Sequence, residues 1–142
     1  MPMSQHFLRP SPESGQSFAQ AFANGPFAML YLLRFHEWAD YSADQHLAPE
    51  HPISGREAYE RFVNHAEPFL KAAGGETIFM GDAAHFLIGP PDEQWDAVMI
   101  LRQPSVQSFF DYNRSPEFLA GVGHRTAAVD DVRVLPISEI AF

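Results

Sequence analysis

The chain has 142 residues, which suits one domain, and carries a formal net charge of −9 from nine basic and eighteen acidic residues. It contains no cysteine, so zinc ribbons, disulfide scaffolds and cysteine nucleophiles are excluded. An acidic chain lacks the basic surface that binds a phosphate backbone, so nucleic acid is not an expected partner.

The N-terminal segment has no basic head followed by an apolar run, as a signal peptide would. No stretch approaches the ~20 apolar residues that a membrane helix needs. We therefore expect a cytoplasmic protein without a membrane partner. Residues 1–25 are expected to form an arm with a short helix from Ser14 to Ala23, and residues 26–142 to form the domain.

The first half of the domain predicts a strand followed by a helix. Phe27–His36 is a short and nearly unbroken apolar run, which favours a buried strand. Ser54 and Glu57 have the spacing of a capping box, which starts a helix. Apolar residues then recur at helical spacing until Gly74-Gly75 ends the helix. Pro68 lies inside this run and is expected to kink it.

The second half predicts two strands, helical segments and a last strand. These are Glu76–Gly89 with a bulge near Gly81, Trp95–Gln103, a helix from Pro104-Ser105 through Tyr112, a helix capped by Ser115-Pro116, and Val129–Ile137. The whole order is βαββαβ, which is typical of an α+β ferredoxin-like fold. That fold has a four-stranded antiparallel sheet with helices on one face.

Alternation along the predicted strands gives the sheet two different faces. In Trp95–Arg102 the face with Trp95 and Met99 is wholly apolar, so we assign it to the helices. The second face of this strand is charged only at its ends and contains Val98 and Ile100. The strand at Phe27–His36 behaves in the same way and contributes Leu30 and Leu32 to the second face. Large exposed apolar patches usually mark interfaces, so we expect a homodimer whose sheets pack face to face. The alternative is that the N-terminal arm covers this face in a monomer.

Eight short runs, in order over roughly residues 16–137, resemble a known family. They are Tyr31-Leu-Leu-Arg-Phe35, Ala39-Asp-Tyr41, Ser54-Gly-Arg-Glu-Ala-Tyr59, Leu87-Ile-Gly-Pro90, Trp95-Asp96, Arg102-Gln-Pro-Ser105, Ser115-Pro-Glu-Phe118 and His124-Arg-Thr-Ala-Ala128. The family is an uncharacterised bacterial one of the dimeric α/β-barrel superfamily. The resemblance implies a ferredoxin-like homodimer and no established activity. The superfamily includes cofactor-free oxygenases, isomerases, dehalogenases, haem enzymes and non-catalytic binding proteins. The family usually has asparagine where this chain has Tyr31.

A first candidate site lies on the sheet face that we assign to the dimer. Arg34, His36 and Arg102 fall on this face, and we expect His85 and Arg133 to join them. Cations converging between two sheets would favour a carboxylate or an enolate, because arginine forks match such oxygens. The alternative is that Arg34 and Arg102 pair with Asp96 or Asp131 at the rim, since buried charges must be paired.

A second candidate is the pair His124 and Arg125, which we expect after the last helix. A histidine there could act as a general acid or base, because its pKa lies near neutrality. The alternative is that both residues cap the helix by bonding its free carbonyl groups.

A third candidate is the connection at residues 37–53, with Tyr59 on the helix that follows. Trp38 and Tyr41 in this connection could line a pocket for a flat organic molecule. Alternatively, they anchor the connection to the body or to the partner subunit.

Metal and cofactor binding have little support in the sequence. His36, His46 and His51 are not at the spacing of a metal site, and no cofactor is expected. Haem needs only one axial histidine, for which His85 or His124 would serve. The sequence thus predicts a protein that binds a small anionic or aromatic metabolite, and that transforms it, if at all, without a metal. The residues concerned are Arg34, Tyr41, Tyr59, His85, Arg102 and Arg125, with His124 as the acid or base. The alternative function is a non-catalytic structural or interaction homodimer.

Overall fold

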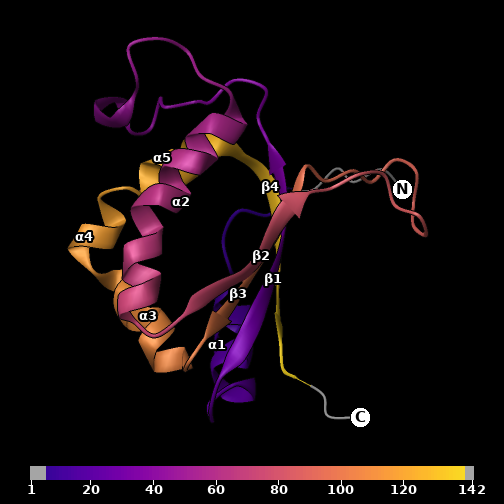
Figure 1. The fold of residues 1–142 in the computed structure, drawn as a ribbon, viewed down its shortest axis with the longest axis vertical. Helices are drawn as coiled ribbons and strands as arrows, with labels where there is room; N and C mark the ends of the chain where they lie inside the picture. Colours follow the sequence, from indigo (N-terminus) through magenta and orange to yellow (C-terminus); the bar gives the residue numbers. More distant parts are fainter. Residues whose placement is uncertain (1–5, 140–142) are drawn as a thin grey trace.

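The computed structural model describes residues 6–139, which form one antiparallel sheet and its helices (Figure 1). The elements are α1 (Pro12–Ala21), β1 (Phe27–Phe35), the short 3-10 helix η1 (Gln45–Leu47), α2 (Gly55–Ala72), β2 (Glu76–Asp82), β3 (Ala97–Gln103), α3 (Val106–Arg114), α4 (Pro116–Leu119), α5 (Val122–Ala128) and β4 (Val129–Ile137). The strands are ordered β2-β3-β1-β4, and each neighbouring pair is antiparallel. The predicted α+β ferredoxin-like fold is confirmed.

Helix α2 begins and ends close to the predicted positions. The Ser54 hydroxyl accepts the Glu57 backbone N–H at 3.0 Å, but the Glu57 carboxylate faces that hydroxyl at 3.4 Å, so only half of the capping box forms. Gly74 follows the helix with a φ of 85°, which favours glycine. The helix runs through Pro68, which lies on its exposed side. Within residues 6–139 no helix is both long and apolar enough to cross a membrane.

Strand β2 is shorter than predicted, and its bulge lies elsewhere. Asp82 pairs with Ala97, the first residue of β3, so the chain beyond Asp82 has no partner strand. The register shifts between Thr77 and Phe79, not at Gly81. Residues 83–96 therefore form a long connection that projects from the sheet on the side away from the helices (Figure 1).

The prediction that Trp95 faces the helices is wrong. Trp95 precedes β3, so the alternation of that strand does not extend to it. Its indole ring lies 5.3 Å from the Arg34 guanidinium and 5.1 Å from that of Arg133, on the other face of the sheet. The Asp96 carboxylate accepts the Phe35 N–H at 2.8 Å and fixes this junction.

The core lies between the sheet and the helices, and α1 packs at its margin. The core includes the buried side chains of Leu33, Tyr59, Phe62, Met99 and Phe118. On α1, the Phe18 ring lies 5.3 to 5.8 Å from the rings of Phe27, Phe109 and Phe110. The helix of the arm thus packs on the helical side, so the alternative in which the arm covers the opposite face does not apply to the described residues.

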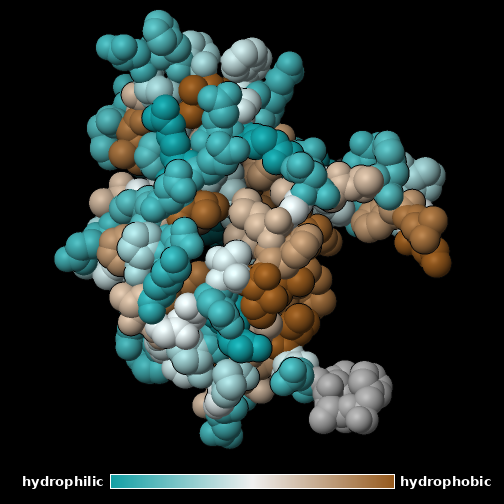
Figure 2. Space-filling model, in the orientation of Figure 1, coloured by the Kyte–Doolittle hydropathy of each residue, from teal (hydrophilic) through white to brown (hydrophobic). Residues whose placement is uncertain are grey.

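The opposite face carries a continuous apolar row, which we call the open face. Phe79, Ile100, Leu30 and Leu135 lie directly opposite one another across all four strands. Phe79 and Leu135 are each 57% exposed. Figure 2 shows this hydrophobic surface on the sheet side of the molecule, with more apolar surface at the tip of the projecting connection.

Candidate functional site

A cavity of about 570 Å³ lies between the sheet and the helices. Its floor is formed by β1, β3 and β4, and its walls come from α1, α2, α3, α4, α5 and residues 7–10 of the arm. The lining is mostly apolar, with two methionines, Met29 and Met99, and several phenylalanines. Its volume lies within the ~300–1,000 Å³ of small-molecule sites.

Three phenol groups meet at this cavity. Tyr31 projects from β1, Tyr59 from α2 and Tyr112 from α3, and all three line the cavity. The Tyr112 hydroxyl accepts a bond from the Gln103 amide at 2.9 Å and keeps its own proton to donate. Among residues 6–139, the Tyr59 hydroxyl has no hydrogen-bond partner, and that of Tyr31 meets only the Met29 sulfur at 3.7 Å.

Burial keeps these phenols protonated. It raises the pKa of Tyr59 to about 12, with Arg125 acting in the opposite direction. Burial also raises the pKa of Tyr31 far above its ordinary value, and the neighbouring Tyr59 raises it further. At neutral pH both groups are therefore hydrogen-bond donors rather than bases.

The charged groups of the cavity are all cationic. Arg9, Arg125 and Arg133 line it, and no Asp or Glu of residues 6–139 does. Arg133 is paired with Asp131, whereas Arg9 and Arg125 have no ion pair with any described residue. Arg125 lines the same cavity as Tyr31 and Tyr59, and its charge favours the ionised form of both phenols. The cavity thus offers donors and positive charge to a ligand.

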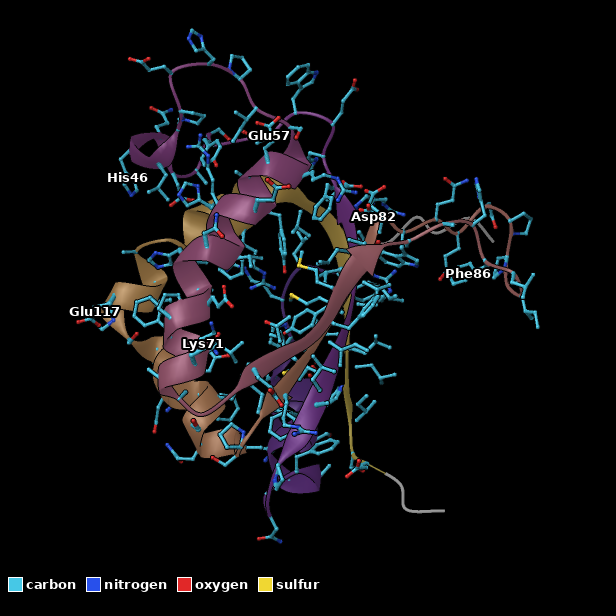
Figure 3. All side chains as sticks on the ribbon, viewed as in Figure 1. His46, Glu57, Lys71, Asp82, Phe86 and Glu117 are labelled. Atoms are coloured by element: carbon cyan, nitrogen blue, oxygen red, sulfur yellow. The ribbon has the colours of Figure 1, made fainter. Side chains whose placement is uncertain are left out.

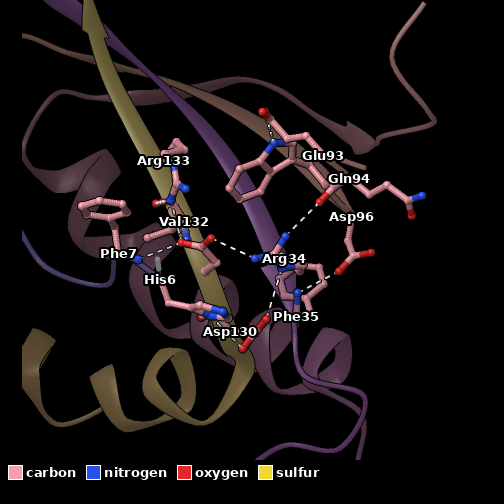
Figure 4. A network of polar contacts seen from close by, with 12 residues as sticks. His6, Phe7, Arg34, Phe35, Glu93, Gln94, Asp96, Asp130, Val132 and Arg133 are labelled. Atoms are coloured by element: carbon pink, nitrogen blue, oxygen red, sulfur yellow. Dashed lines mark hydrogen bonds and ion pairs between the residues drawn. The ribbon is translucent and has the colours of Figure 1, made fainter. Parts of the chain in front are cut away.

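A buried carboxylate fastens the arm that forms one wall of the cavity (Figure 4). Asp131 is fully buried and accepts bonds from the Phe7 backbone N–H at 2.8 Å, Arg34 at 2.9 Å and Arg133 at 2.6 Å. Burial alone would raise the pKa of Asp131, but the bonds from Phe7 and from the two arginines outweigh it and lower the pKa. The Phe7 ring lies 4.7 Å from the Arg133 guanidinium.

The arginines predicted for the open face do not converge on a ligand site in the single chain. Arg34 is paired with Asp130 at 3.1 Å and with Asp131 at 2.9 Å, which is the rim pairing considered as the alternative. Arg102 pairs with Glu76 at 3.2 Å, not with Asp96. His36 lies 3.8 Å from Asp130. The charges of Arg34 and Arg102 are thus already compensated by carboxylates.

The two residues considered as an acid–base candidate separate in the fold. Both lie inside α5 rather than after a helix, and Arg125 is in the last turn of α5, where the alternative placed a cation. Within residues 6–139 neither side chain is bonded to a helix carbonyl group. Arg125 faces the cavity, whereas His124 does not line it. The His124 Nδ1 atom is bonded to the Tyr41 hydroxyl at 2.8 Å. Burial lowers the pKa of His124, and the nearby Arg61 and His65 lower it further.

The connection at residues 37–53 lies at the N-terminal end of α2 and the C-terminal end of α5, and it does not line the cavity. Tyr41 is buried there and anchors the connection through His124, while Trp38 is 61% exposed. The expectation that His85 lies on the sheet face is wrong, because it is exposed on the projecting connection. Of the predicted site residues, the structure brings Tyr59 and Arg125 to the cavity.

The cavity also contains parts that the sequence patterns did not predict, namely Tyr31, Tyr112, Asn113 and the arm. A usable indication was present for Tyr31, since a tyrosine on the apolar face of a buried strand needs a place for its hydroxyl. For the arm, the sequence carries no comparable indication. No group of three or more His, Cys, Asp or Glu residues between 6 and 139 is arranged to hold a metal ion.

Comparison with known proteins identifies related chains of unknown function. The profile of a domain of unknown function, DUF1330, matches residues 50–137. The RPA0582 protein of Rhodopseudomonas palustris, described as being of unknown function, is 31% identical, with 96% of this chain and 99% of that chain covered and a TM-score of 0.83. Its methylated form is 32% identical over 96% of both chains, with the same TM-score.

More distant structures share the fold alone. A Dabb-family protein from Mesorhizobium loti with a ferredoxin-like fold is 13% identical and has a TM-score of 0.51, covering 83% of this chain and all of that one. A protein from Bacteroides fragilis, described as dimeric, ferredoxin-like and of unknown function, is 11% identical with a TM-score of 0.50, covering 80% of this chain and 96% of that one. A search among curated proteins finds no match.

Proposed function

The chain belongs to the DUF1330 family, whose function is unknown, and we propose from its geometry that it binds a small organic anion in the cavity. The ligand is a carboxylate or an enolate with an apolar or aromatic body. The observation that carries this proposal is that Arg125, which has no ion pair with any of residues 6–139, lines a mostly apolar cavity together with the protonated phenols of Tyr31 and Tyr59.

The polarity of the cavity selects the charge of the ligand. Arginine is always charged, and protonated phenols donate, so the site favours an acceptor with negative charge. The apolar lining favours a body that loses contact with water, since burial of such surface drives binding. A cationic ligand would be repelled by the arginines of the cavity. A strongly hydrated ligand would lose its water without gaining enough hydrogen bonds in return.

The proposal is one of binding rather than of catalysis. His124, the group with the acid–base chemistry expected from the sequence, does not line the cavity and is bonded to Tyr41. The phenols at the cavity hold their protons too tightly to act as bases at neutral pH.

The test compares matched anionic and neutral ligands. Benzoate and cinnamate, with benzamide and cinnamamide as uncharged counterparts, are titrated into the protein by calorimetry and by thermal shift. A ligand that binds the folded state raises the melting temperature. We expect the carboxylates to bind and the amides to bind at least tenfold more weakly.

Variants then assign the binding to the cavity. Arg125→Gln removes a charge-assisted bond worth about 1.5–3 kcal/mol, so the Kd of the carboxylate should rise roughly 10- to 100-fold. Arg56→Gln is the matched control, because Arg56 is exposed and does not line the cavity. Tyr59→Phe should weaken binding severalfold without loss of stability, since the Tyr59 hydroxyl has no hydrogen-bond partner among residues 6–139. Equal binding by the Arg125 and Arg56 variants would overturn the assignment.

We also propose that the chain forms a homodimer through the open face. The apolar row of Phe79, Ile100, Leu30 and Leu135 supports this, because a patch of this kind usually marks an interface. The relative from Bacteroides fragilis is described as dimeric, which agrees with it. The Leu135→Asp variant should be monomeric in sedimentation equilibrium at concentrations where the wild type is dimeric. A dimer that binds none of the anions would favour the structural role considered from the sequence.

A further inference from the structure

The connection between β2 and β3 is an ordered projection, which we call the finger (residues 83–96). Its base is closed by the Ala83 N–H, which donates to the Asp96 carbonyl at 2.9 Å. Nearer the tip, the Glu93 N–H donates to the Pro90 carbonyl at 3.2 Å. The Trp95 indole N–H donates to the Glu93 carboxylate at 3.0 Å. These bonds close the base of the finger and link residues 90–95 of its returning limb.

The tip of the finger exposes large aliphatic side chains. Leu87 is 98% exposed and Ile88 is 91% exposed, and the neighbouring Phe86 is 42% exposed. Gly89 lies against the Phe86 ring, where an added Cβ would come within 2.8 Å of the ring. The Phe86 ring packs on Gly89, whereas Leu87 and Ile88 at the same turn point into the solvent. Single exposed apolar residues are common, but an adjacent pair almost fully in water at the end of a projection indicates a contact with a partner.

The direction of the finger indicates which partner. Figures 1 and 3 show that it leaves the sheet away from the helices, on the side of the open face, with Phe86 far from the helical layer. Resting on the proposed dimer, we infer that each finger docks its apolar tip on the second copy of this chain, so that the two subunits clasp each other.

The reach of the finger agrees with this arrangement. Stacked sheets lie ~10 Å apart. Half of the 14 residues from 83 to 96 can extend roughly 20 Å at about 3.3 Å per residue. This upper limit exceeds the sheet spacing, so the finger is long enough for its tip to reach the partner's sheet. In a two-fold dimer both tips make the same contact, which closes the assembly.

The charge of the finger disfavours a membrane as the occupant. Residues 83–96 contain Asp92, Glu93 and Asp96 and no lysine or arginine. Anionic lipid surfaces attract basic segments and repel acidic ones. A second copy of this chain needs no such attraction, because its open face offers apolar surface.

The absence of cysteine from the chain makes a clean experiment possible. An Ile88→Cys variant is labelled with a benzophenone maleimide and mixed with an equal amount of unlabelled ¹⁵N protein before irradiation. We expect cross-links between labelled and ¹⁵N subunits. In parallel, the double variant Leu87→Asp with Ile88→Asp should raise the dimer Kd at least tenfold in sedimentation equilibrium. Leu119→Asp is the control, because Leu119 is 52% exposed on α4, on the helical side.

The outcomes separate the finger from the dimer. An unchanged dimer Kd in the double variant, with no cross-link between subunits, overturns the inference that the finger contacts the second copy. A monomeric Leu135→Asp variant would then still support the dimer itself. A wild type that is monomeric throughout overturns both. Binding of the wild type, but not of the double variant, to vesicles of phosphatidylglycerol would also overturn the clasp, in favour of a membrane contact. Retained circular dichroism in every variant excludes unfolding as the cause.

Discussion

Asp131 ties the N-terminal arm to the sheet, because its buried carboxylate accepts the backbone N–H of Phe7 at 2.8 Å. A second bond joins the same segments, because the Val132 N–H donates to the Phe7 carbonyl at 3.1 Å. This exchange places the arm at the edge of β4, which has no neighbouring strand on that side within residues 6–139. Residues 7–10 form a wall of the cavity, so the bonds that hold the arm on the edge of β4 also hold this wall in place.

Replacing this carboxylate should destabilise the fold strongly. Asp131→Asn leaves the guanidinium groups of Arg34 and Arg133 without their buried partner. Breaking a buried pair costs about 3 kcal/mol or more, which a urea titration measures as a lower midpoint. Asp130→Asn is the matched control: its side chain is 30% exposed, and loss of such a pair costs ~1 kcal/mol or less. Equal losses in the two variants would contradict the role given to Asp131.

Loosening the arm should speed ligand exchange at the cavity. Phe7→Ala removes the ring that stacks on Arg133 but keeps both backbone bonds of the arm. We expect the anionic dye 8-anilinonaphthalene-1-sulfonate to associate and dissociate severalfold faster, with a smaller change in its Kd. Stopped-flow fluorescence measures both rates. Unchanged rates would mean that a ligand enters by another route.

The stability of the protein should depend on pH through His124. Burial, Arg61 and His65 lower the pKa of His124 in the folded state, so the unfolded chain binds this proton more readily. Stability from this group is therefore full above pH 6.5 and declines as the pH falls from 6.5 toward the folded value. The groups facing His124 are Tyr41, Arg61 and His65.

Urea titrations between pH 7.5 and pH 5.5 test this dependence. The His124→Gln variant should lose less stability over that range than the wild type does. His46→Gln, which changes an exposed histidine on η1, should retain the slope of the wild type. If His124→Gln also retains that slope, another group carries the pH dependence.

Two glycine-to-alanine changes should have opposite effects. A Cβ at Gly55 would collide with the backbone carbonyl oxygens of His36 and Ala128, so Gly55→Ala should destabilise the fold by several kcal/mol or prevent it. Gly15 lies in α1 with nothing within 4 Å of an added Cβ. Gly15→Ala should therefore stabilise the protein by about 0.5–1 kcal/mol. Thermal melts measure both, and destabilisation by Gly15→Ala would contradict the geometry of α1.

Local patterns predicted most of the elements because their causes are local. The apolar run at 27–36, the Ser54 cap and the left-handed Gly74 each depend on residues a few positions away, and β4 has the predicted bounds Val129–Ile137. The errors at Trp95 and at the end of β2 have one cause. A strand ends where its partner ends, and the sequence of one strand does not contain that information.

The site required the tertiary structure for the same reason. From its own sequence the chain determined a ferredoxin-like sheet with one apolar face left uncovered, since alternation is a property of each strand. Whether an arginine is free or paired depends on residues far away in the chain. Arg34 meets Asp131 across 97 positions, whereas Arg125 lines the cavity with phenols from two other elements and pairs with no acid among residues 6–139. Such long-range pairing decides which cation can receive a ligand, and only the folded chain brings those partners together.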